Sequence, residues 1–285
     1  MIPVLVLLLA ASPAPPAWIA AAGGVAQGDS VDLRASWVTD SDMPLLVRMP
    51  ELKRLDLSAT RISDRGLRAL RPAAGITDLD LTFAEQVGDE GTSALRNWKH
   101  LRRLSLRGTK ITDNTLEMLE GVATIESLDI AFAQLTDAGL DHLTALPNLR
   151  ELSMGGNKLT GAGLDFLRQV PQLRVLDIGG SQRTDSGLWN ILLTEPGVDA
   201  IGTLAELRAF YANGTALTAP WLRRLSKLSK LERMGLQGCK KIGHDAVPAL
   251  GQFTSLKWLD VKDTALSPED VSALGKLLPR TEILH

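Results

Sequence analysis

Residue types that support catalysis are sparse in this sequence. Cys239 is the only cysteine, and His244 follows it five residues later, so these two side chains form a candidate nucleophile–base pair. Neither a phosphate-binding G-x-x-x-x-G-K-[ST] loop nor a G-x-S-x-G nucleophile elbow occurs. The histidines lack metal-ligand spacing: His100, His142, His244 and His285. We therefore expect Cys239 to be a small buried thiol, and we predict a protein that is not an enzyme, with no catalytic residue, metal or cofactor.

A second set of residues has the composition of a binding surface. Aromatic and arginine side chains dominate the energetics of protein interfaces. Here they recur, together with aspartates, at spacings close to two dozen residues or multiples of that length. If this spacing reflects a structural repeat, the partner-binding candidates share one face: Phe83, Arg107, Asp129, Phe132, Asp177, Tyr211, Arg233 and Trp258. For the two phenylalanines, the alternative is that their rings tuck into the edge of the core.

The repeat that positions these side chains is visible in the leucine spacing. The pattern L-x-x-L-x-L-x-x-T-x-I-x-D-x-x-L-x-x-L begins at Leu52 and returns along the chain. Its leading apolar residues stand at 52, 76, 101, 125, 149, 173, 207, 231 and 256, mostly 24 or 25 residues apart. An N-terminal copy around Val31 and Leu33 completes about ten copies over roughly residues 29–278, and residues 282–284 are a candidate last edge strand.

Each copy combines two periodicities. The alternating L-x-L predicts a short strand with one buried face, and the later L-x-x-L suits a helical turn. Between them, Ser63-Asp64, Thr112-Asp113 and Thr136-Asp137 supply helix-capping oxygens. One strand and one short helix cannot bury their apolar faces alone, so the copies must stack. The predicted fold is an α/β solenoid of about ten 24-residue strand–helix repeats with a parallel sheet on its concave side.

These residues resemble the leucine-rich-repeat superfamily. The ITDxGLxxL form is similar to the ribonuclease-inhibitor-like and cysteine-containing subclasses, and the segment around Cys239 resembles the cysteine-containing form in particular. The resemblance covers nearly all of residues 29–285 and implies a horseshoe fold. It says little about the ligand, because one fold serves many unrelated partners.

In such a fold the residues between the strand leucines face the concave side. One of these positions is rich in aspartate, and reads Asp32, Asp56, Asp80, Ser105, Asp129, Ser153, Asp177, Tyr211, Gly235 and Asp260. Carboxylates on adjacent strands repel one another. The column therefore either attracts a basic partner or a cation, or is neutralised by neighbouring side chains. Similarly, the glycines at 155, 156, 179, 180 and 214 either form a floor for a partner or serve the turns.

The charge balance bears on the choice of partner. The chain holds 31 Lys and Arg against 33 Asp and Glu, which gives no electrostatic reason to expect nucleic acid. We expect a monomeric, non-catalytic module that binds a protein or peptide on its concave face. Two alternatives stay open: a regulator of an enzyme, such as an inhibitor or GTPase activator offering Arg107 or Arg233, and a structural protein of the cell envelope.

Two parts of the chain depart from the repeat pattern: the N-terminal residues and one long spacing between repeats. Residues 2–11 are apolar and Ala20–Ala22 offers a cleavage site, so residues 1–28 are predicted to be a signal peptide or an apolar leader. Export to the periplasm or outside the cell is then expected, with the cytoplasm as the alternative and no membrane span. The step from Leu173 to Leu207 is 34 residues long, and we predict a loop insertion at residues 194–203.

Overall fold

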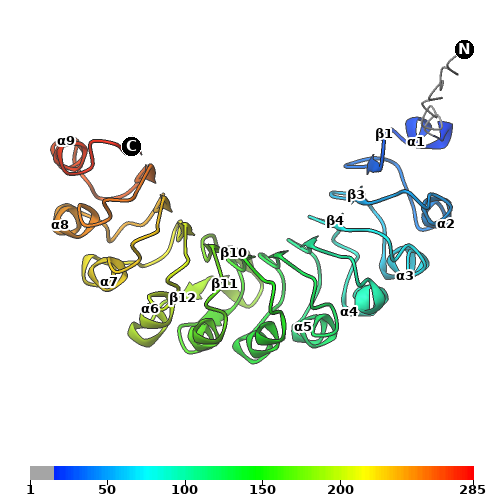
Figure 1. The fold of residues 1–285 in the computed structure, drawn as a ribbon, viewed down its shortest axis with the longest axis horizontal. Helices are drawn as coiled ribbons and strands as arrows, with labels where there is room; N and C mark the ends of the chain where they lie inside the picture. Colours follow the sequence, from blue (N-terminus) through cyan, green and yellow to red (C-terminus); the bar gives the residue numbers. More distant parts are fainter. Residues whose placement is uncertain (1–15) are drawn as a thin grey trace, which may run out of the picture.

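Short strands line the inner side of an arc, and short helical segments cover its outer side (Figure 1). The structure is a computed structural model and describes residues 16–285. Within these residues the inner sheet has twelve strands, and all neighbouring pairs are parallel except β1–β2. In order across the sheet they are β1 (Val25–Gln27), β2 (Ser30–Asp32), β3 (Arg54–Asp56), β4 (Asp78–Asp80), β5 (Arg103–Ser105), β6 (Ser127–Asp129), β7 (Glu151–Ser153), β9 (Val175–Asp177), β13 (Ala209–Tyr211), β14 (Arg233–Gly235), β15 (Trp258–Asp260) and β16 (Glu282–Leu284). The predicted solenoid with a parallel inner sheet and a last edge strand is confirmed.

The outer segments are short because each repeat must fit a strand, a helical turn and two connections into about two dozen residues. Several are 3₁₀ rather than α-helices, which is common for pieces of this length. In chain order they are α2 (Met43–Val47), α3 (Asp64–Ala69), α4 (Asp89–Thr92) with η1 (Ser93–Asn97), α5 (Asp113–Leu119), η2 (Asp137–Ala145), η3 (Gly163–Gln169), α6 (Glu195–Ile201), α7 (Ala219–Leu225), η4 (His244–Ala246) with α8 (Val247–Leu250), and α9 (Pro268–Leu277).

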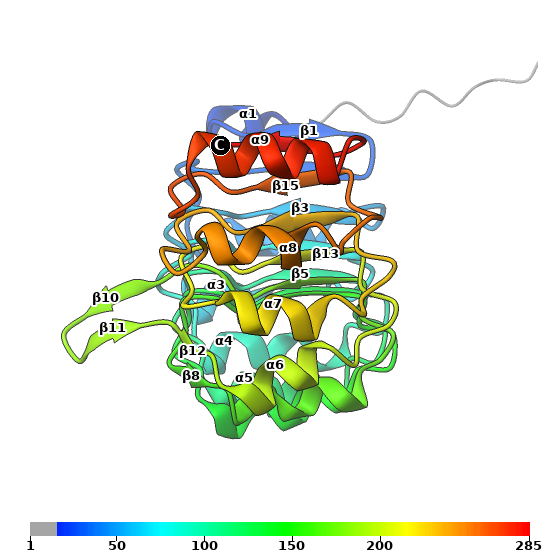
Figure 2. The same cartoon turned by 90° about the vertical axis from the view of Figure 1, so that its left-hand side faces the viewer.

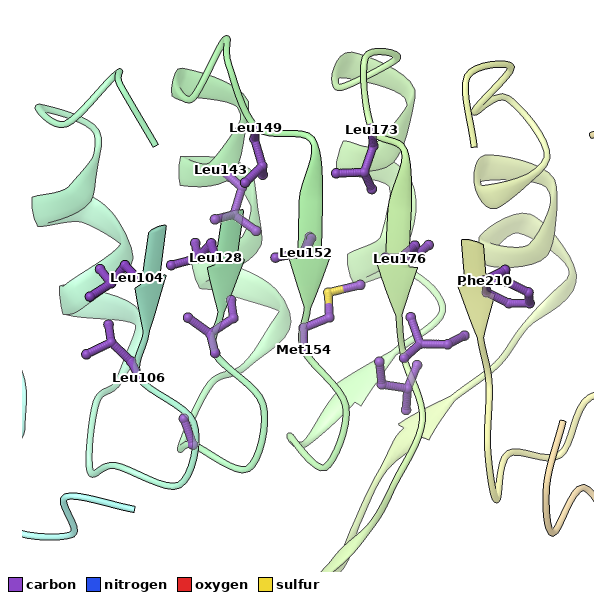
Figure 3. Packing of buried hydrophobic residues seen from close by; sticks show 14 of the residues in the cluster. Leu104, Leu106, Leu128, Leu143, Leu149, Leu152, Met154, Leu173, Leu176 and Phe210 are labelled. Carbon is purple, nitrogen blue, oxygen red and sulfur yellow. The ribbon is translucent and has the colours of Figure 1, made fainter. Parts of the chain in front are cut away.

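A continuous apolar core fills the space between the two layers. The middle residue of each strand points into it, and the sheet register stacks these residues from one repeat to the next. Figure 3 shows this row for Leu104, Leu128, Leu152, Leu176 and Phe210, each at most 2% exposed. The second strand leucines and the outer leucines complete the core, so each repeat buries its apolar side against its neighbours.

The threonine–aspartate pairs link the repeats more than they cap helices. Asp113 accepts hydrogen bonds from the backbone N–H (2.9 Å) and the hydroxyl (2.6 Å) of Thr136 in the next repeat. The same bonds join Asp40 to Ser63 and Asp89 to Thr112. Side-chain capping, as predicted, occurs at Ser63 and Thr112, whereas the Thr136 side chain makes no capping bond. The motif is therefore mainly an inter-repeat connector.

The glycine of the same motif gives room for this carboxylate. A Cβ atom on Gly139 would lie 2.4 Å from Oδ1 of Asp113, well inside van der Waals contact. The arrangement recurs at Gly163 with Asp137 and at Gly91 with Asp64. At these three sites the aspartate of one repeat therefore favours glycine in the next. Asp89 instead faces Thr115, whose hydroxyl donates to it at 2.6 Å.

Replacing Asp89 with asparagine is expected to lower the free energy of unfolding at neutral pH by about 1.5 kcal/mol, since it weakens charge-assisted bonds. Burial raises the pKa of the Asp89 carboxyl, but hydrogen bonds from Thr112 and Thr115 outweigh it and hold this pKa below its ordinary value. A carboxyl with a lowered folded pKa contributes stability that is lost as the pH falls through that pKa. Urea unfolding between neutral pH and pH ~3 measures both effects, and the asparagine variant should show a smaller loss on acidification. Asp141→Asn, at an exposed position of η2, is the control. Equal stability of Asp89→Asn and the control would contradict the connector role.

The N-terminal boundary lies earlier than residue 29, where the sequence analysis placed it. Helix α1 (Ala17–Ala21) buries Ile19 in the core, and β1 pairs antiparallel with β2. Residues 16–28 thus cover the apolar end of the first described repeat. Of the predicted leader, residues 1–15 lie outside the described residues. Within residues 16–285, no helix is long and apolar enough to cross a bilayer.

The predicted insertion at residues 194–203 is wrong in position. Thr194 caps α6 by accepting from the N–H of Gly197 (3.3 Å), and α6 is an ordinary outer helix. The extra residues form a hairpin, β10 (Gln182–Thr184) and β11 (Gly187–Trp189), which projects from one flank (Figure 2). Ile191 in β12 (Ile191–Leu192), paired with β8 (Leu159–Thr160), fills the core position that an uninterrupted 24-residue spacing from Leu159 would give to Arg183. Arg183 is exposed on the hairpin, so no guanidinium is buried.

Candidate concave binding surface

The sheet register brings the predicted aspartates into one line on the concave face. Asp56 pairs with Asp80, Ser105 with Asp129, and Ser153 with Asp177. Tyr211 follows directly, since its strand pairs with that of Asp177 on one side and that of Gly235 on the other. The inner residues of successive repeats therefore form a regular array, as the repeat pattern predicts.

Backbone N–H groups of the protein itself donate hydrogen bonds to the carboxylates of the aspartate column. Each of the six aspartates in the column accepts a hydrogen bond from the backbone N–H two residues later, at 2.8–3.0 Å: Asp32, Asp56, Asp80, Asp129, Asp177 and Asp260. These bonds orient the carboxylates at the strand ends and offset their mutual repulsion. The structure thus favours the interpretation in which neighbouring groups neutralise the column.

On the N-terminal half of the concave face, arginine and aspartate side chains form ion pairs with one another. Arg34 lies 2.7 Å from Asp56, and Arg103 lies 2.7 Å from Asp78. Arg54 pairs with Asp29 in the same way. Four of these side chains, Arg54, Asp56, Asp78 and Arg103, border a shallow hollow of about 260 Å³ over β3–β6. The arginines of this half are therefore already paired with aspartates and are less available to a partner.

A compact cluster occupies the middle of the sheet. The guanidinium of Arg107 donates to Asp129 (2.8 Å) and to the Ser153 hydroxyl (3.0 Å), and it lies 5.1 Å from the centre of the Phe132 ring. Asp177 lines an adjoining hollow of about 250 Å³ with Arg107. Burial raises the pKa of the Asp177 carboxyl, against the opposing effects of the Gly179 N–H and Arg107.

A second cluster lies toward the C-terminal end. The rings of Tyr211 and Trp258 meet edge to face, with centroids 6.2 Å apart. The Arg233 guanidinium stacks 4.8 Å from the centre of the Trp258 ring and donates from Nε to the Tyr211 hydroxyl (3.2 Å). Among the described residues Arg233 has no ion-pair partner, in contrast to the arginines of the N-terminal half. Tyr211 also borders the central hollow, so the two clusters adjoin.

Seven of the eight predicted residues thus gather in these two clusters, and Phe83 does not. Its ring is on the flank, 51% exposed, and covers Gly108 of the next repeat. The alternative that the Phe83 ring tucks into the core is therefore wrong. Phe132 is half-buried between the central cluster and the flank, where it lies against Gly156 and Gly180. Both phenylalanines have left-handed backbone angles, with φ of 56° and 55°.

The residues that could support catalysis are not assembled for it. The Cys239 thiol is buried, donates to the carbonyl of Ala212 (3.1 Å), and has a raised pKa because of its burial. His244 instead contacts Asp270 at 2.6 Å. Within residues 16–285, no group of three His, Cys, Asp or Glu side chains is arranged to hold a metal ion. Cys239 is thus a structural thiol, as the sequence analysis expected.

Two residues of the surface were not among the predicted site residues. Ser153 takes a direct hydrogen bond from Arg107, and its place in the aspartate column was the available signal. Trp189 lines the hairpin flank, and the 34-residue step was the signal there, but the insertion was placed too late in the chain.

Comparison with known proteins agrees with this architecture. Four segments, residues 49–70, 99–119, 123–143 and 145–167, match the Leucine Rich repeat family model. The fold is a leucine-rich-repeat horseshoe, and the matched segments are leucine-rich repeats. A comparison with curated proteins finds no match.

Among solved structures, the chain is similar to an internalin (inlF) from Listeria monocytogenes, at 20% identity and a TM-score of 0.64, over 85% of this chain and 63% of that one. It is also similar to a TDR receptor, at 17% identity and a TM-score of 0.59, over 91% of this chain and 43% of that one. The chain therefore spans less than two thirds of either structure. At this identity, the likeness shows the fold.

Proposed function

We propose that this protein is a non-catalytic interaction module that binds a protein or peptide partner on its concave face. The observation that carries the proposal is the Tyr211–Arg233–Trp258 cluster. Its two aromatic rings and one arginine are held in fixed geometry on an open sheet, and such side chains form the energetic centres of interfaces. Leucine-rich-repeat proteins mediate protein–protein contacts, which agrees with this role.

The surroundings of the cluster support the same role. The neighbouring inner positions are Val175, half-buried, and Ala209, 6% exposed, so an apolar floor adjoins the rings. The free donors of Arg233 suit a carboxylate or backbone carbonyl of a partner. Because Arg233 is already held by Trp258 and Tyr211, it loses little side-chain entropy on binding.

Two other functions have less support. An enzyme regulator that offers an arginine from one end of the solenoid has less support, because Arg107 is bound to Asp129 and Ser153 in mid-sheet. Arg233 keeps free donors, but it is stacked on Trp258 and two further strands lie beyond its own. A structural envelope protein that assembles through its ends predicts a mass that rises with concentration. We propose instead a monomer, exported on the evidence of its apolar N-terminal segment. The Thr-Asp-x-Gly-Leu motif supports membership of the ribonuclease-inhibitor-like subclass.

The double substitution Tyr211→Ala with Trp258→Ala is expected to abolish capture of a partner from cell lysate. Removing two central aromatic anchors weakens binding by about 30-fold or more. The thermal midpoint should stay near that of the wild type, because both rings stand on the surface of the sheet. The measurement is a pull-down with immobilised chain, read by mass spectrometry.

Trp37→Ala is the matched control. Trp37 is 83% exposed, on the connection that follows β2, and belongs to neither cluster. Its removal should leave capture unchanged. Capture that survives the double substitution but fails with Trp37→Ala would place the binding surface elsewhere.

A further inference from the structure

The hairpin β10–β11 encloses a groove on the flank of the horseshoe, outside the concave clusters. The groove has a volume of about 570 Å³ and runs across the turns of three successive repeats. Its apolar walls are Phe83, Phe132 and Trp189, and its rim carries Glu85, Lys110 and Asp185. Figure 2 shows the hairpin extending sideways from the body. Residues of both hairpin strands and of the turn between them line the groove.

The hairpin is fastened at its base. The side-chain amide of Gln182 donates to the carbonyl oxygens of Ala133 (3.0 Å) and Gly156 (2.8 Å), which belong to two preceding repeats. Gln182 pairs across the hairpin with Trp189, whose indole N–H donates to Ser186 (3.0 Å). Two strands of three residues are too short to be stable alone. These bonds therefore hold Trp189 over the flank.

The two phenylalanines occupy a backbone position that disfavours them. The turn after each strand places one residue in the left-handed region. Among the described residues this position is Gly108, Gly156, Gly180, Gly214 or Gly238 in five repeats, whereas the small residues Ala35 and Ala59 and the polar Asp263 take it in three others. A bulky residue in this conformation is strained, and such strain gathers at functional sites. The strained backbone at Phe83 and Phe132 aims both rings at one groove.

We propose that this groove binds an extended peptide segment of the protein partner and takes a large apolar side chain between Phe83, Phe132 and Trp189. The inference rests on the proposed function. Phe132 belongs to both surfaces, because its ring faces Arg107 on the concave side and lines the groove on the flank. A segment that leaves the concave face beside Arg107 therefore enters the groove directly.

Length and charge also suit a peptide. Phe83 and Phe132 stand two repeats apart, about 10 Å at the spacing of strands, which about three residues of extended chain span. Glu85, Lys110 and Asp185 make no ion pair among the described residues, so charges of both signs are available to the polar groups of a peptide. The groove thus provides an apolar anchor site with a mixed polar rim.

Selection from a phage-displayed library of random 12-residue peptides on the full chain tests the proposal. We expect enriched peptides that share a large apolar residue. By fluorescence polarisation, their affinity should fall about tenfold or more with Trp189→Ala, as for loss of an interface anchor. Phe83→Gly should have the same effect, and it suits the left-handed backbone, so folding is preserved. Leu188→Ala, on the opposite face of the hairpin and 59% exposed, should change affinity less than twofold.

The outcomes separate this groove from the concave face. Groove peptides should still bind the Tyr211→Ala, Trp258→Ala variant, whatever becomes of partner capture by that variant. If no peptide is enriched, or if all enriched peptides bind Trp189→Ala and Phe83→Gly as well as the wild type, the proposal is overturned. Binding to a glycan array that is lost with Trp189→Ala, in the absence of any peptide, would overturn it as well and point to a sugar site.

Discussion

Replacing Gly155 with alanine is expected to lower the free energy of unfolding by about 3 kcal/mol, the upper part of the range for overpacked cores. A Cβ atom on Gly155 would lie 1.6 Å from the carbonyl oxygen of Gly179 and 2.6 Å from its carbon. Both are backbone atoms of the next repeat, fixed by the sheet, so no side chain can move aside. Repeats β7 and β9 would have to separate, and their leucine contacts would weaken.

Gly275→Ala is the matched control, and it is expected to raise the free energy of unfolding where Gly155→Ala lowers it. Gly275 is in α9, and a Cβ atom there would meet nothing within 4 Å. Alanine in a helix is more stable than glycine by roughly 0.5–1 kcal/mol, so this variant should gain stability. Guanidinium unfolding followed by circular dichroism measures both. Equal, small effects for the two variants would show that the repeats are not packed backbone to backbone at Gly155.

Phe210→Ala is expected to destabilise the protein by about 3–5 kcal/mol, as for other buried aromatic residues. Phe210 is fully buried and takes the strand position that leucine holds in most repeats, between Leu176 and Met234. Its removal leaves a cavity at the interface between two repeats. Because each repeat contacts only its neighbours, the weakened interface should split unfolding into two calorimetric transitions.

The Phe210→Leu variant distinguishes the effect of leaving a cavity from the effect of changing the residue type at this strand position. Leucine is the ordinary residue of this column, and β13 pairs with leucine and methionine strands, so the loss should be below about 1.5 kcal/mol. A single transition with an unchanged midpoint for the alanine variant would mean that residue 210 does not bridge the repeats as described.

The repeat itself could be predicted from the sequence because its physical cause is local. Leucines two residues apart specify a strand with one buried face, and leucines three residues apart specify a helical turn. The repeats stack because neither element can bury its apolar face alone. The register in turn places Asp129, Asp177 and Tyr211 side by side. The residues of the concave clusters could therefore be predicted one by one from the sequence. The stacking of Arg107 on Phe132 and of Arg233 on Trp258 could not, because it depends on side-chain conformations that the repeat pattern does not specify.

The insertion could not be placed by the same reasoning. Thr184-Asp185 and Thr194-Glu195 both follow a suitable strand and both suit a helix start, and they are ten residues apart, the excess of the long step. The structure uses the second pair, because Ile191 rather than Arg183 can fill the core position. An uninterrupted repeat would bury the Arg183 guanidinium without a partner, which is costly, and this cost favours an insertion that begins earlier in the chain.

The N-terminal boundary was missed for a different reason. Residues 17–27 carry no repeat pattern, since they cap the solenoid instead of continuing it, and their apolar composition is also that of a leader. Ile19 is buried because it packs on the apolar end of the first described repeat. Caps of repeat proteins differ from the repeats for this reason, and a periodicity argument does not detect them.

Hydroxyl-radical footprinting of the chain, alone and with its captured partner, tests the concave surface most directly. Tyr211 and Trp258 are both partly exposed, so both are modified in the free chain, and Trp37 provides an internal reference. We predict that the partner lowers the modification rates of Tyr211 and Trp258 several-fold and leaves that of Trp37 unchanged. Protection of Trp37, with Tyr211 and Trp258 modified as fast as in the free chain, would contradict binding on the concave face.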